Sequence, residues 1–457
     1  MSCQSFARAG LRHAPPQYDK TLSWVSPNRL YVRYRAAAAA RIAQSVDGAA
    51  GAVLGVDIGP IQGGFGHRAI TLPAGSNLAT VTATLRRNPD VAEVAPVHLR
   101  RVMAASEPDA VDDPLSDNQD QWYIYIDNAD PGAWEINTGS TNVSLAVIDS
   151  GVDETNADFS SKLSYQESIV NGVTSTAGGA AQDTNGHGTN VAGIADAQAN
   201  NGFGFAGVGY NTKLQAYKIF PNTTSSDCNP SADTADEVTA INTAVANGAS
   251  VINLSLGAPN SSGPDSAEQS AIDNALAHNV SVVAAAGNDD ASAPDYPAAY
   301  AGVIAVGASS AVDGNPSSTP PYTSITGEAI ASYSNSGPTL VAPGGDPTSD
   351  TDEDLLHWIE NYSTTTDGYP PDECQLFNPG GGNVCAELFA GTSQATASVS
   401  GTVALMEAEH GGSRSLTPSQ IVTILTKTTD VLPGGISSAR QGAGRVDVAK
   451  AVAGSAP

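Results

Sequence analysis

The sequence predicts an α/β protein built on a doubly wound, mainly parallel sheet and preceded by a small α+β domain. Short, almost entirely apolar runs such as SLAVIDSG, KLQAYKIF and VINLSLG are typical of strands buried on both faces. Helical stretches separate these runs, as in a sheet whose parallel strands are joined by crossover helices. The net charge changes from +7 over residues 1–106 to −34 over residues 107–457, which favours two units with different roles.

The basic first unit alternates strands with helices. Residues 1–29 show little pattern and are expected to be irregular. The small domain is expected over residues 30–103, in the order strand 30–36, helix 36–46, strand 67–73, helix 78–88 and strand 91–102. Residues 104–118 are polar and contain Pro, which predicts an exposed linker ahead of the second domain, residues 119–457.

The second unit places helices between its buried strands. Residues 234–248 show a helical pattern with one apolar face, made of Ala235, Val238, Ile241, Ala244 and Val245. Residues 266–279 show a second helical pattern. Ligands of such sheets bind beyond the carboxyl ends of the strands, so the functional residues are expected there.

Composition narrows the classes of function. The chain contains no run of 18 apolar residues, so no transmembrane helix and no membrane partner are expected. The acidic unit would repel phosphates, so no nucleic-acid partner is expected. Its acidity has two open explanations, solubility in salty surroundings or the steering of cationic ligands. Residues 1–30 lack the apolar stretch of a secretory signal, which leaves another export route or a different start codon open.

The four cysteines show neither a CxxC pair nor a Cys/His zinc spacing. Cys374 and Cys385 lie close together in a Gly- and Pro-rich stretch and are predicted to form a disulfide. Such a bond would stabilise the loop by roughly 3 kcal/mol and favours an extracellular or periplasmic location. Cys228 has no obvious partner, and Cys3 lies near the amino terminus.

Three short blocks each present one residue of a nucleophilic site. They are VIDSG with Asp149, NGHGT with His187, and GTS with Ser393. Taken singly, Asp149 resembles a cap or turn residue, His187 a structural histidine and Ser393 a helix N-cap. Taken together, they supply what a serine nucleophile needs, a base and a buried carboxylate that orients the base.

An α/β-hydrolase site is the obvious alternative, and the sequence argues against it. That site requires a GxSxG elbow and the order Ser, acid, His. Here Ser393 stands in GTSQA and follows His187. A further block, AAAGN, ends a buried strand on Asn288, which is either a turn former or a side-chain amide aimed at an oxyanion.

These blocks resemble those of the subtilase family over residues 115–453, including NLSLGAP, YSNSGP, VAPGG and GTSQATASVSG. The resemblance implies a serine endopeptidase with Asp149, His187 and Ser393 as its triad and Asn288 as its oxyanion donor. It also implies that substrate backbone pairs as an added strand with Ser255, Leu256 and Gly257.

Residues 30–103 resemble the family's inhibitory propeptide, through their rhythm of strands and helices and the block NPDVAEVAP. The chain is therefore expected to be a self-processing proenzyme and a monomer, with proteins or peptides as substrates and its own propeptide as inhibitor. The propeptide's positive charge suits an acidic enzyme. The alternative is a binding protein on a subtilase fold that has lost catalysis, against which the complete triad argues.

The chain departs from the family pattern at several positions. Asn190 stands where the family usually has a second His, and Gln394 follows the serine in place of Met. Ala397 and Ser398 replace the usual Pro and His. Residues 345–388 form a long insertion ahead of the serine block.

The resemblance also implies a structural calcium ion. Hard cations bind carboxylate and carbonyl oxygens, and the implied ligands are Asp158, Gln198, Asn201, Phe203, Phe205 and either Gln119 or Gln121. The alternative is that residues 198–205 form an ordinary surface turn.

The stretch PDYPA resembles the base of the family's primary specificity pocket, and it places Asp295 where relatives often have a small neutral residue. A carboxylate there would favour Lys or Arg before the scissile bond. Alternatively Asp295 points to solvent, and Leu256 and Ala285 form an apolar pocket for large hydrophobic side chains.

Overall fold

The computed structural model describes the chain over residues 25–34, 67–72, 76–89, 91–102, 105–107, 121–201, 204–222, 231–311, 327–347, 357–364 and 385–457.

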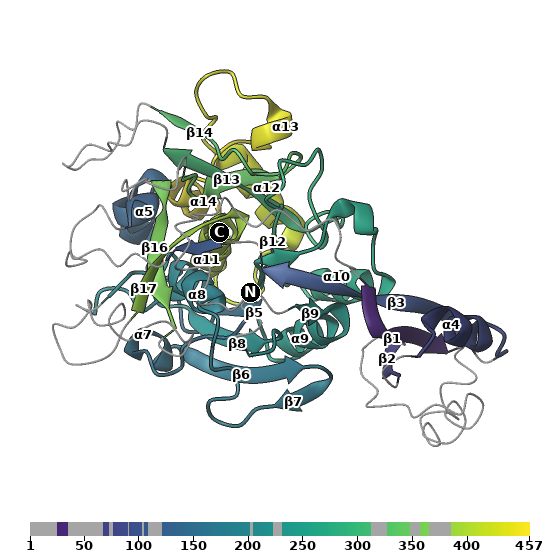
Figure 1. Cartoon of the computed structure of the whole chain (residues 1–457). Helices are drawn as coiled ribbons and strands as arrows, with labels where there is room; N and C mark the ends of the chain where they lie inside the picture. The colour runs from purple at the N-terminus through teal and green to yellow at the C-terminus, as the bar shows by residue number, and fades with distance from the viewer. Residues whose placement is uncertain are drawn as a thin grey trace.

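A nine-stranded sheet forms the centre of the second domain (Figure 1). Its strand order is β14-β13-β12-β10-β5-β8-β6-β7, with β15 beside β13. All pairings are parallel except those of the edge strands β14 and β7. The doubly wound, mainly parallel sheet is therefore confirmed. The strands are β5 (Ser144–Asp149), β6 (Leu163–Val170), β7 (Val173–Ser175), β8 (Lys213–Lys218), β10 (Val251–Leu254), β12 (Ser281–Ala285), β13 (Ile304–Ala311), β14 (Glu328–Ile330) and β15 (Leu340–Pro343).

Helices cover both faces of this sheet because successive strand residues point to opposite faces. In β5, Leu145 and Val147 pack with one helical layer, and Ala146 and Ile148 pack with the other. The first layer contains α8 (His187–Asp196), α11 (Thr392–His410), α12 (Pro418–Thr428) and α14 (Val448–Gly454). The second contains α9 (Thr234–Ala246) and α10 (Ser266–Ala277), and the five apolar residues predicted for the first of these helices all lie in its core.

Short helices complete the second domain: α5 (Trp122–Ile126), η1 (Ala129–Ala133), α6 (Trp134–Ile136), α7 (Ala157–Ser160), η2 (Asn260–Ser262) and α13 (Ser438–Gln441). No helix among the described residues is both long enough and apolar enough to cross a bilayer.

The small domain consists of β1 (Val25–Tyr34), β2 (His67–Thr71), α4 (Leu78–Arg86) and β3 (Val91–Val102), shown in purple and dark blue in Figure 1. The strand β1 lies between β2 and β3 and is antiparallel to both. Helix α4 buries Val81 and Leu85 against them. The expectation of an irregular segment up to residue 29 is wrong for residues 25–29, which belong to β1. The predicted helix 36–46 lies outside the described residues.

The strand β3 extends from the small domain onto the second domain. It pairs antiparallel with β9 (Ala232–Asp233) and β11 (Leu256–Gly257). The next strand, β4 (Ala105–Glu107), pairs antiparallel with β17 (Cys385–Ala390), which in turn pairs with β16 (Ile359–Ser363). The predicted linker thus begins with a strand, because main-chain pairing to an open strand edge does not require apolar side chains.

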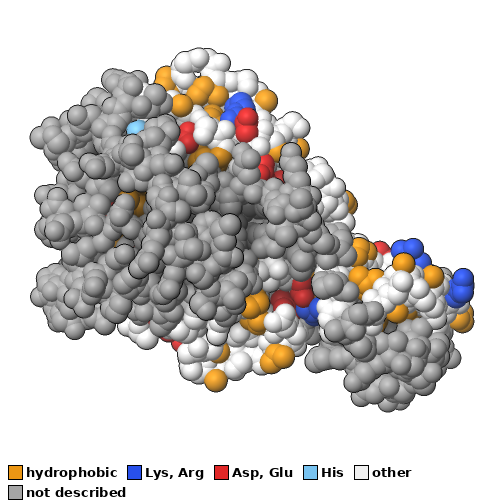
Figure 2. All heavy atoms as spheres, in the orientation of Figure 1, with side chains coloured by type: hydrophobic (Ala, Val, Ile, Leu, Met, Phe, Trp, Pro, Cys, Tyr) orange, Lys and Arg blue, Asp and Glu red, His pale blue; other side chains and the backbone are white. Residues whose placement is uncertain are grey.

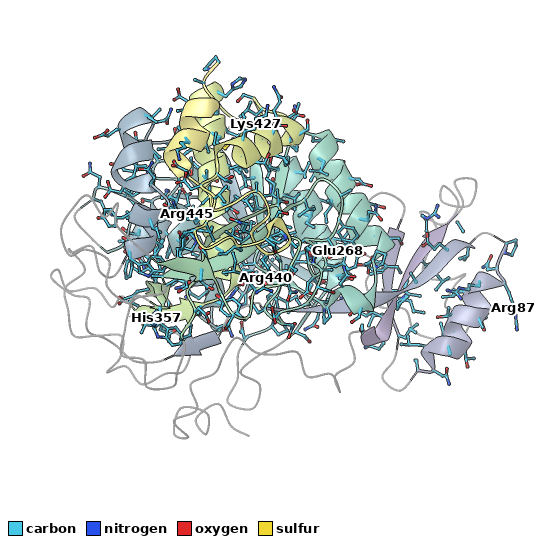
Figure 3. All side chains as sticks on the ribbon, turned by 90° about the horizontal axis from the view of Figure 1, so that it is seen from above. Arg87, Glu268, His357, Lys427, Arg440 and Arg445 are labelled. Carbon is cyan, nitrogen blue, oxygen red and sulfur yellow. The ribbon has the colours of Figure 1, made fainter. Side chains whose placement is uncertain are left out.

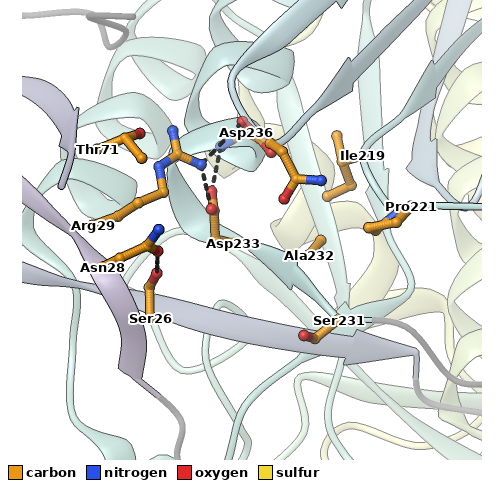
Figure 4. A pocket seen from close by; sticks show the side chains of 11 residues that line it. Ser26, Asn28, Arg29, Thr71, Ile219, Pro221, Ser231, Ala232, Asp233 and Asp236 are labelled. Carbon is orange, nitrogen blue, oxygen red and sulfur yellow. Dashed lines mark hydrogen bonds and ion pairs between the residues drawn. The ribbon is translucent and has the colours of Figure 1, made fainter. Parts of the chain in front are cut away.

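Arg29 joins the two domains beside a cavity of about 450 Å³ (Figure 4). Its guanidinium forms ion pairs with Asp233 and Asp236, and Tyr31 donates a hydrogen bond to Thr234 at 3.1 Å. Burial is the main cause that raises the pKa of Asp236 to about 7, and the negative charge of the neighbouring Asp233 adds to it. Electrostatic attraction therefore acts through a buried contact at this point of the interface.

Two other arginines of the small domain, Arg33 and Arg87, form no ion pair with the described residues of the second domain. Figure 2 shows basic side chains on the outer end of this domain, and Figure 3 places Arg87 on the side remote from the second domain. Arg33 pairs with Glu93 within the domain.

Candidate active site

Asp149 ends β5 at the carboxyl edge of the sheet, where the sequence predicted functional residues. Its side chain is fully buried. The oxygen Oδ1 accepts a hydrogen bond from the Ser150 amide at 2.7 Å and lies 2.7 Å from Nδ1 of His187. Lys218 donates to the Ser150 carbonyl at 2.6 Å, and burial lowers the pKa of this lysine. The carboxylate is thus held in a dry setting and oriented toward the imidazole.

His187 is the first residue of α8. Gly186 precedes it with φ of 94°, a left-handed conformation that favours glycine. Gly188 follows it, and a Cβ there would collide with the Gly151 carbonyl oxygen. The imidazole uses Nδ1 toward Asp149, and its Nε2 has no hydrogen-bond partner among the described residues. That nitrogen is the one placed to exchange a proton.

Ser393 is buried in the first turn of α11. Its Oγ donates to the carbonyl of Ser255 at 3.1 Å, and the Ser255 hydroxyl donates back to the Ser393 carbonyl at 2.9 Å. Ser393 is therefore hydrogen-bonded to the residue that precedes β11, the strand that pairs with β3.

Asn288 follows β12 and faces the start of α11. Its Oδ1 accepts from the Thr392 amide at 3.0 Å and from the Thr392 hydroxyl at 2.8 Å. Because the oxygen is engaged, Nδ2 is the end of this side chain that can donate to an oxyanion. The role of Thr392 was not predicted, although its position beside Ser393 is the signal that could have suggested it.

Two of the departures from the family pattern contact each other. Gln394 donates to Asn190 at 3.0 Å, and both side chains are fully buried. The two replacements thus form one hydrogen-bonded unit behind the site. Phe389 of β17 contacts the His187 ring edge-on, with centroids 6.3 Å apart. Sequence reasoning missed this contact because Phe389 directly follows the long insertion and lies outside the blocks that carry the family resemblance.

The small domain and β4 flank the serine on two sides. On one side Leu256 pairs with Val102 and Gly257 with Arg101. On the other, β4 pairs with β17 so that Ala105 is opposite Ala390. The chain therefore approaches the site along β11 and leaves it along β17, as an extended peptide would.

Asp295 is buried, so the expectation that it points to solvent is wrong. Its amide donates to the Ala286 carbonyl at 2.9 Å, and its Oδ1 accepts from the Asn260 amide at 3.3 Å. The other carboxylate oxygen lies against Gly287, where a Cβ would not fit. The carboxylate is thus packed between the end of β12 and the segment that follows β11, because Tyr296 pairs with Ala258.

Asp158 and Asn201 come together as predicted for a calcium site, but their hydrogen bonds do not fit a cation. Asn201 donates its amide Nδ2 to Oδ1 of Asp158 at 2.6 Å, and the Tyr362 hydroxyl donates to Oδ2. Burial raises the pKa of Asp158 to about 6. The Phe205 amide donates to the Tyr362 hydroxyl at 2.9 Å, so an N–H group also points into this position.

The other implied calcium ligands give no support for a metal site. Gln121 uses both ends of its amide on the backbone of Ala206, at 2.9 and 3.0 Å. Gln198 donates to the Ala199 carbonyl at 3.2 Å. Gln119 and Phe203 lie outside the described residues. Across the described part of the chain, no three His, Cys, Asp or Glu residues are grouped so that they could hold a metal.

Cys385 is disulfide-bonded at the start of β17. Cys374 lies outside the described residues, so their pairing stays a prediction.

An aspartate–histidine pair, a serine at a helix start and an anchored asparagine at one edge of a doubly wound sheet define the class: an α/β protein with a candidate serine-nucleophile site. Residues 140–444 match the Subtilase family, and the chain belongs to this family.

Relatives bear out the family. Thermitase of Thermoactinomyces vulgaris is 32% identical over 322 residues, covering 70% of this chain and 92% of thermitase. The thermophilic serine proteinase of Bacillus sp. (strain AK1) is 33% identical over 272 residues, or 59% of this chain, and halolysin of Haloferax mediterranei is 33% identical over 329 residues, or 71%. The matched regions span 60% and 51% of these two proteins.

The fold is also that of solved structures. Fervidolysin from Fervidobacterium pennivorans, a keratinolytic enzyme related to subtilisin, aligns with a TM-score of 0.73 at 21% identity. The alignment covers 97% of this chain and 63% of fervidolysin. Identity this low supports the shared fold alone.

Proposed function

We propose that the chain is a serine endopeptidase made as a self-processing precursor. The observation that carries the proposal is the contact of Asp149 with His187 at the edge of the sheet where Ser393 and Asn288 also lie. A binding protein without catalysis would not need a dry carboxylate fixed on an imidazole whose other nitrogen is unpartnered.

The chemistry follows from these atoms. His187 accepts the Ser393 proton at Nε2 while Oγ attacks the peptide carbonyl carbon. The tetrahedral oxyanion takes a hydrogen bond from Nδ2 of Asn288. The imidazolium, stabilised by Asp149, then gives its proton to the leaving amine, and water releases the acyl group by the reverse steps.

A serine-directed phosphonate tests this function directly. We expect the purified protein to be labelled at Ser393 and to lose hydrolysis of a protein substrate in proportion to labelling. Hydrolysis that survives full labelling would contradict the proposed nucleophile. The substrates we propose are proteins and peptides, with the small domain as intramolecular inhibitor; the name "Extracellular protease" of a Xanthomonas campestris relative supports export.

We expect self-cleavage at the bond between Met103 and Ala104. Val102 is the last residue paired with β11 and Ala105 the first paired with β17, so the cut lies between them. Val102 lies opposite Leu256, the residue after Ser255, and the Ser255 carbonyl accepts a hydrogen bond from Ser393. Mass spectrometry of the mature protein should therefore show Ala104 as its first residue.

Two variants sharpen this expectation. Ala104→Pro should block the cut, because proline distorts the leaving peptide bond and removes its N–H, whereas Ala110→Pro should leave the cut unchanged. A mature chain that begins beyond residue 107 in the unaltered protein would show that β3 and β4 do not bracket the scissile bond.

Asp295 is proposed to favour Lys or Arg before the scissile bond. Its carboxylate is buried between the segment after β11 and the strand that leads to Asn288, where a cationic side chain would gain a partner. Met103 in the precursor does not oppose this, because an intramolecular substrate is held at high effective concentration whatever its side chain.

Peptides that differ only in that residue decide the matter. Asp295→Asn should lower the ratio of kcat/KM for Arg over Phe by about tenfold, while kcat/KM for Phe changes little. Asp290→Asn, an exposed acidic residue, is the matched control. An unchanged ratio would assign specificity instead to the apolar walls at Leu256 and Ala285.

A further inference from the structure

We propose that Tyr362 closes the position that the family resemblance assigns to calcium, so that this part of the fold is held by a hydroxyl and needs no metal ion. Tyr362 belongs to β16, within the insertion 345–388. Its hydroxyl donates to Asp158 and accepts from the Phe205 amide at 2.9 Å. It thereby links α7, which carries Asp158, to the end of the loop 198–205.

The direction of the hydrogen bonds distinguishes a hydroxyl from a cation. A calcium ion requires oxygen lone pairs on all sides. Here the Phe205 N–H points at the hydroxyl oxygen of Tyr362. A hydroxyl oxygen can accept a hydrogen bond from an N–H group, whereas an N–H group repels a cation. The Asn201 side chain likewise presents its N–H end to Asp158 at 2.6 Å. The Asn201 N–H therefore has the Asp158 carboxylate as its acceptor, and the Phe205 N–H has the Tyr362 hydroxyl.

Packing makes Tyr362 a permanent part of this region. Its side chain is fully buried. The ring contacts Phe159 edge-on with centroids 5.4 Å apart and Phe205 edge-on at 5.0 Å. Gly204 passes so close to the hydroxyl that a Cβ at that position would overlap it. A ring enclosed in this way cannot swing aside to admit an ion without opening the core.

The negative charge of Asp158 is also compensated without a metal ion. Asp158 carries a single carboxylate, and the buried Lys162 interacts with it electrostatically. Lys162 itself is paired with Asp196 at 2.7 Å. The carboxylate thus has two hydrogen-bond donors and a nearby cation, which is what a buried acid requires.

Thermal unfolding of the full-length Ser393→Ala precursor tests the proposal without any dependence on catalysis. We expect the same Tm in excess EDTA and in excess calcium. Adding Tyr362→Phe should lower Tm by about 4 °C or more in both solutions, because a buried carboxylate and a buried N–H lose their shared partner. Tyr165→Phe, which removes the hydroxyl that a half-buried tyrosine donates to Glu167, is the control and should change Tm less.

Calcium counted by atomic emission after dialysis gives the second readout. Asp158→Asn should bind as many ions per chain as its parent. Loss of one ion in Asp158→Asn, or a Tm of Tyr362→Phe in EDTA equal to that of its parent, would overturn the proposal. If Asp158→Asn does not fold, the Tm values of Tyr362→Phe in EDTA and in calcium are sufficient to decide the matter.

Discussion

Ser393→Ala is expected to abolish peptide hydrolysis and to leave the precursor uncut. In a triad enzyme, removal of the nucleophile lowers kcat on the order of 10⁶-fold, the value known from subtilisin itself. The remaining rate would come from Asn288 and from binding alone. Since Ser393 is also bonded to Ser255, the variant loses one hydrogen bond of the substrate-pairing segment, which is a small effect beside the chemical one.

The measurement has two parts. Gel analysis follows the fraction of chain that keeps the small domain, and a fluorogenic peptide follows turnover of unaltered and variant protein. Ser419→Ala, at an exposed position on α12, is the control and should mature and cleave normally. A Ser393→Ala variant that matures in isolation and retains more than a hundredth of the turnover would end the proposal of a serine protease.

Much of the central sheet and of the site was predictable because both depend on local sequence. The buried strand around Val147 is an apolar run, and its carboxyl end places Asp149 where parallel strands bring ligands. The glycines beside His187 indicate close packing, and in the structure a Cβ at Gly188 would overlap the Gly151 carbonyl oxygen. Ser393 begins a helix rich in small residues, which is also visible in the sequence.

The rest depends on contacts between segments distant in the chain. Tyr362 lies 204 positions from Asp158, in an insertion whose polar sequence has no helical or strand period. The pairing of β4 with β17 involves backbone groups, which leave no mark in the side-chain pattern. The burial of Asp295 likewise arises from tertiary packing, here against Asn260, 35 positions away, whereas its residue type suggested solvent.

Asp149→Asn is expected to give the second largest loss, about 10⁴-fold in kcat with KM little changed. The neutral amide keeps the shape of the carboxylate but can donate its N–H to Nδ1 of His187, 2.7 Å away in the unaltered protein. The imidazole proton then resides on Nε2, which can no longer accept the Ser393 proton.

The same replacement removes the charge that stabilises the imidazolium, so chemistry slows while peptide binding on β11 and β17 is preserved. Steady-state kinetics on one peptide separate the two effects, and circular dichroism verifies the fold. Asp273→Asn, an exposed residue of α10, is the control and should match the unaltered protein. A loss confined to KM, or a kcat within tenfold of normal, would mean that Asp149 does not orient the base, and the role of the buried carboxylate would then be structural.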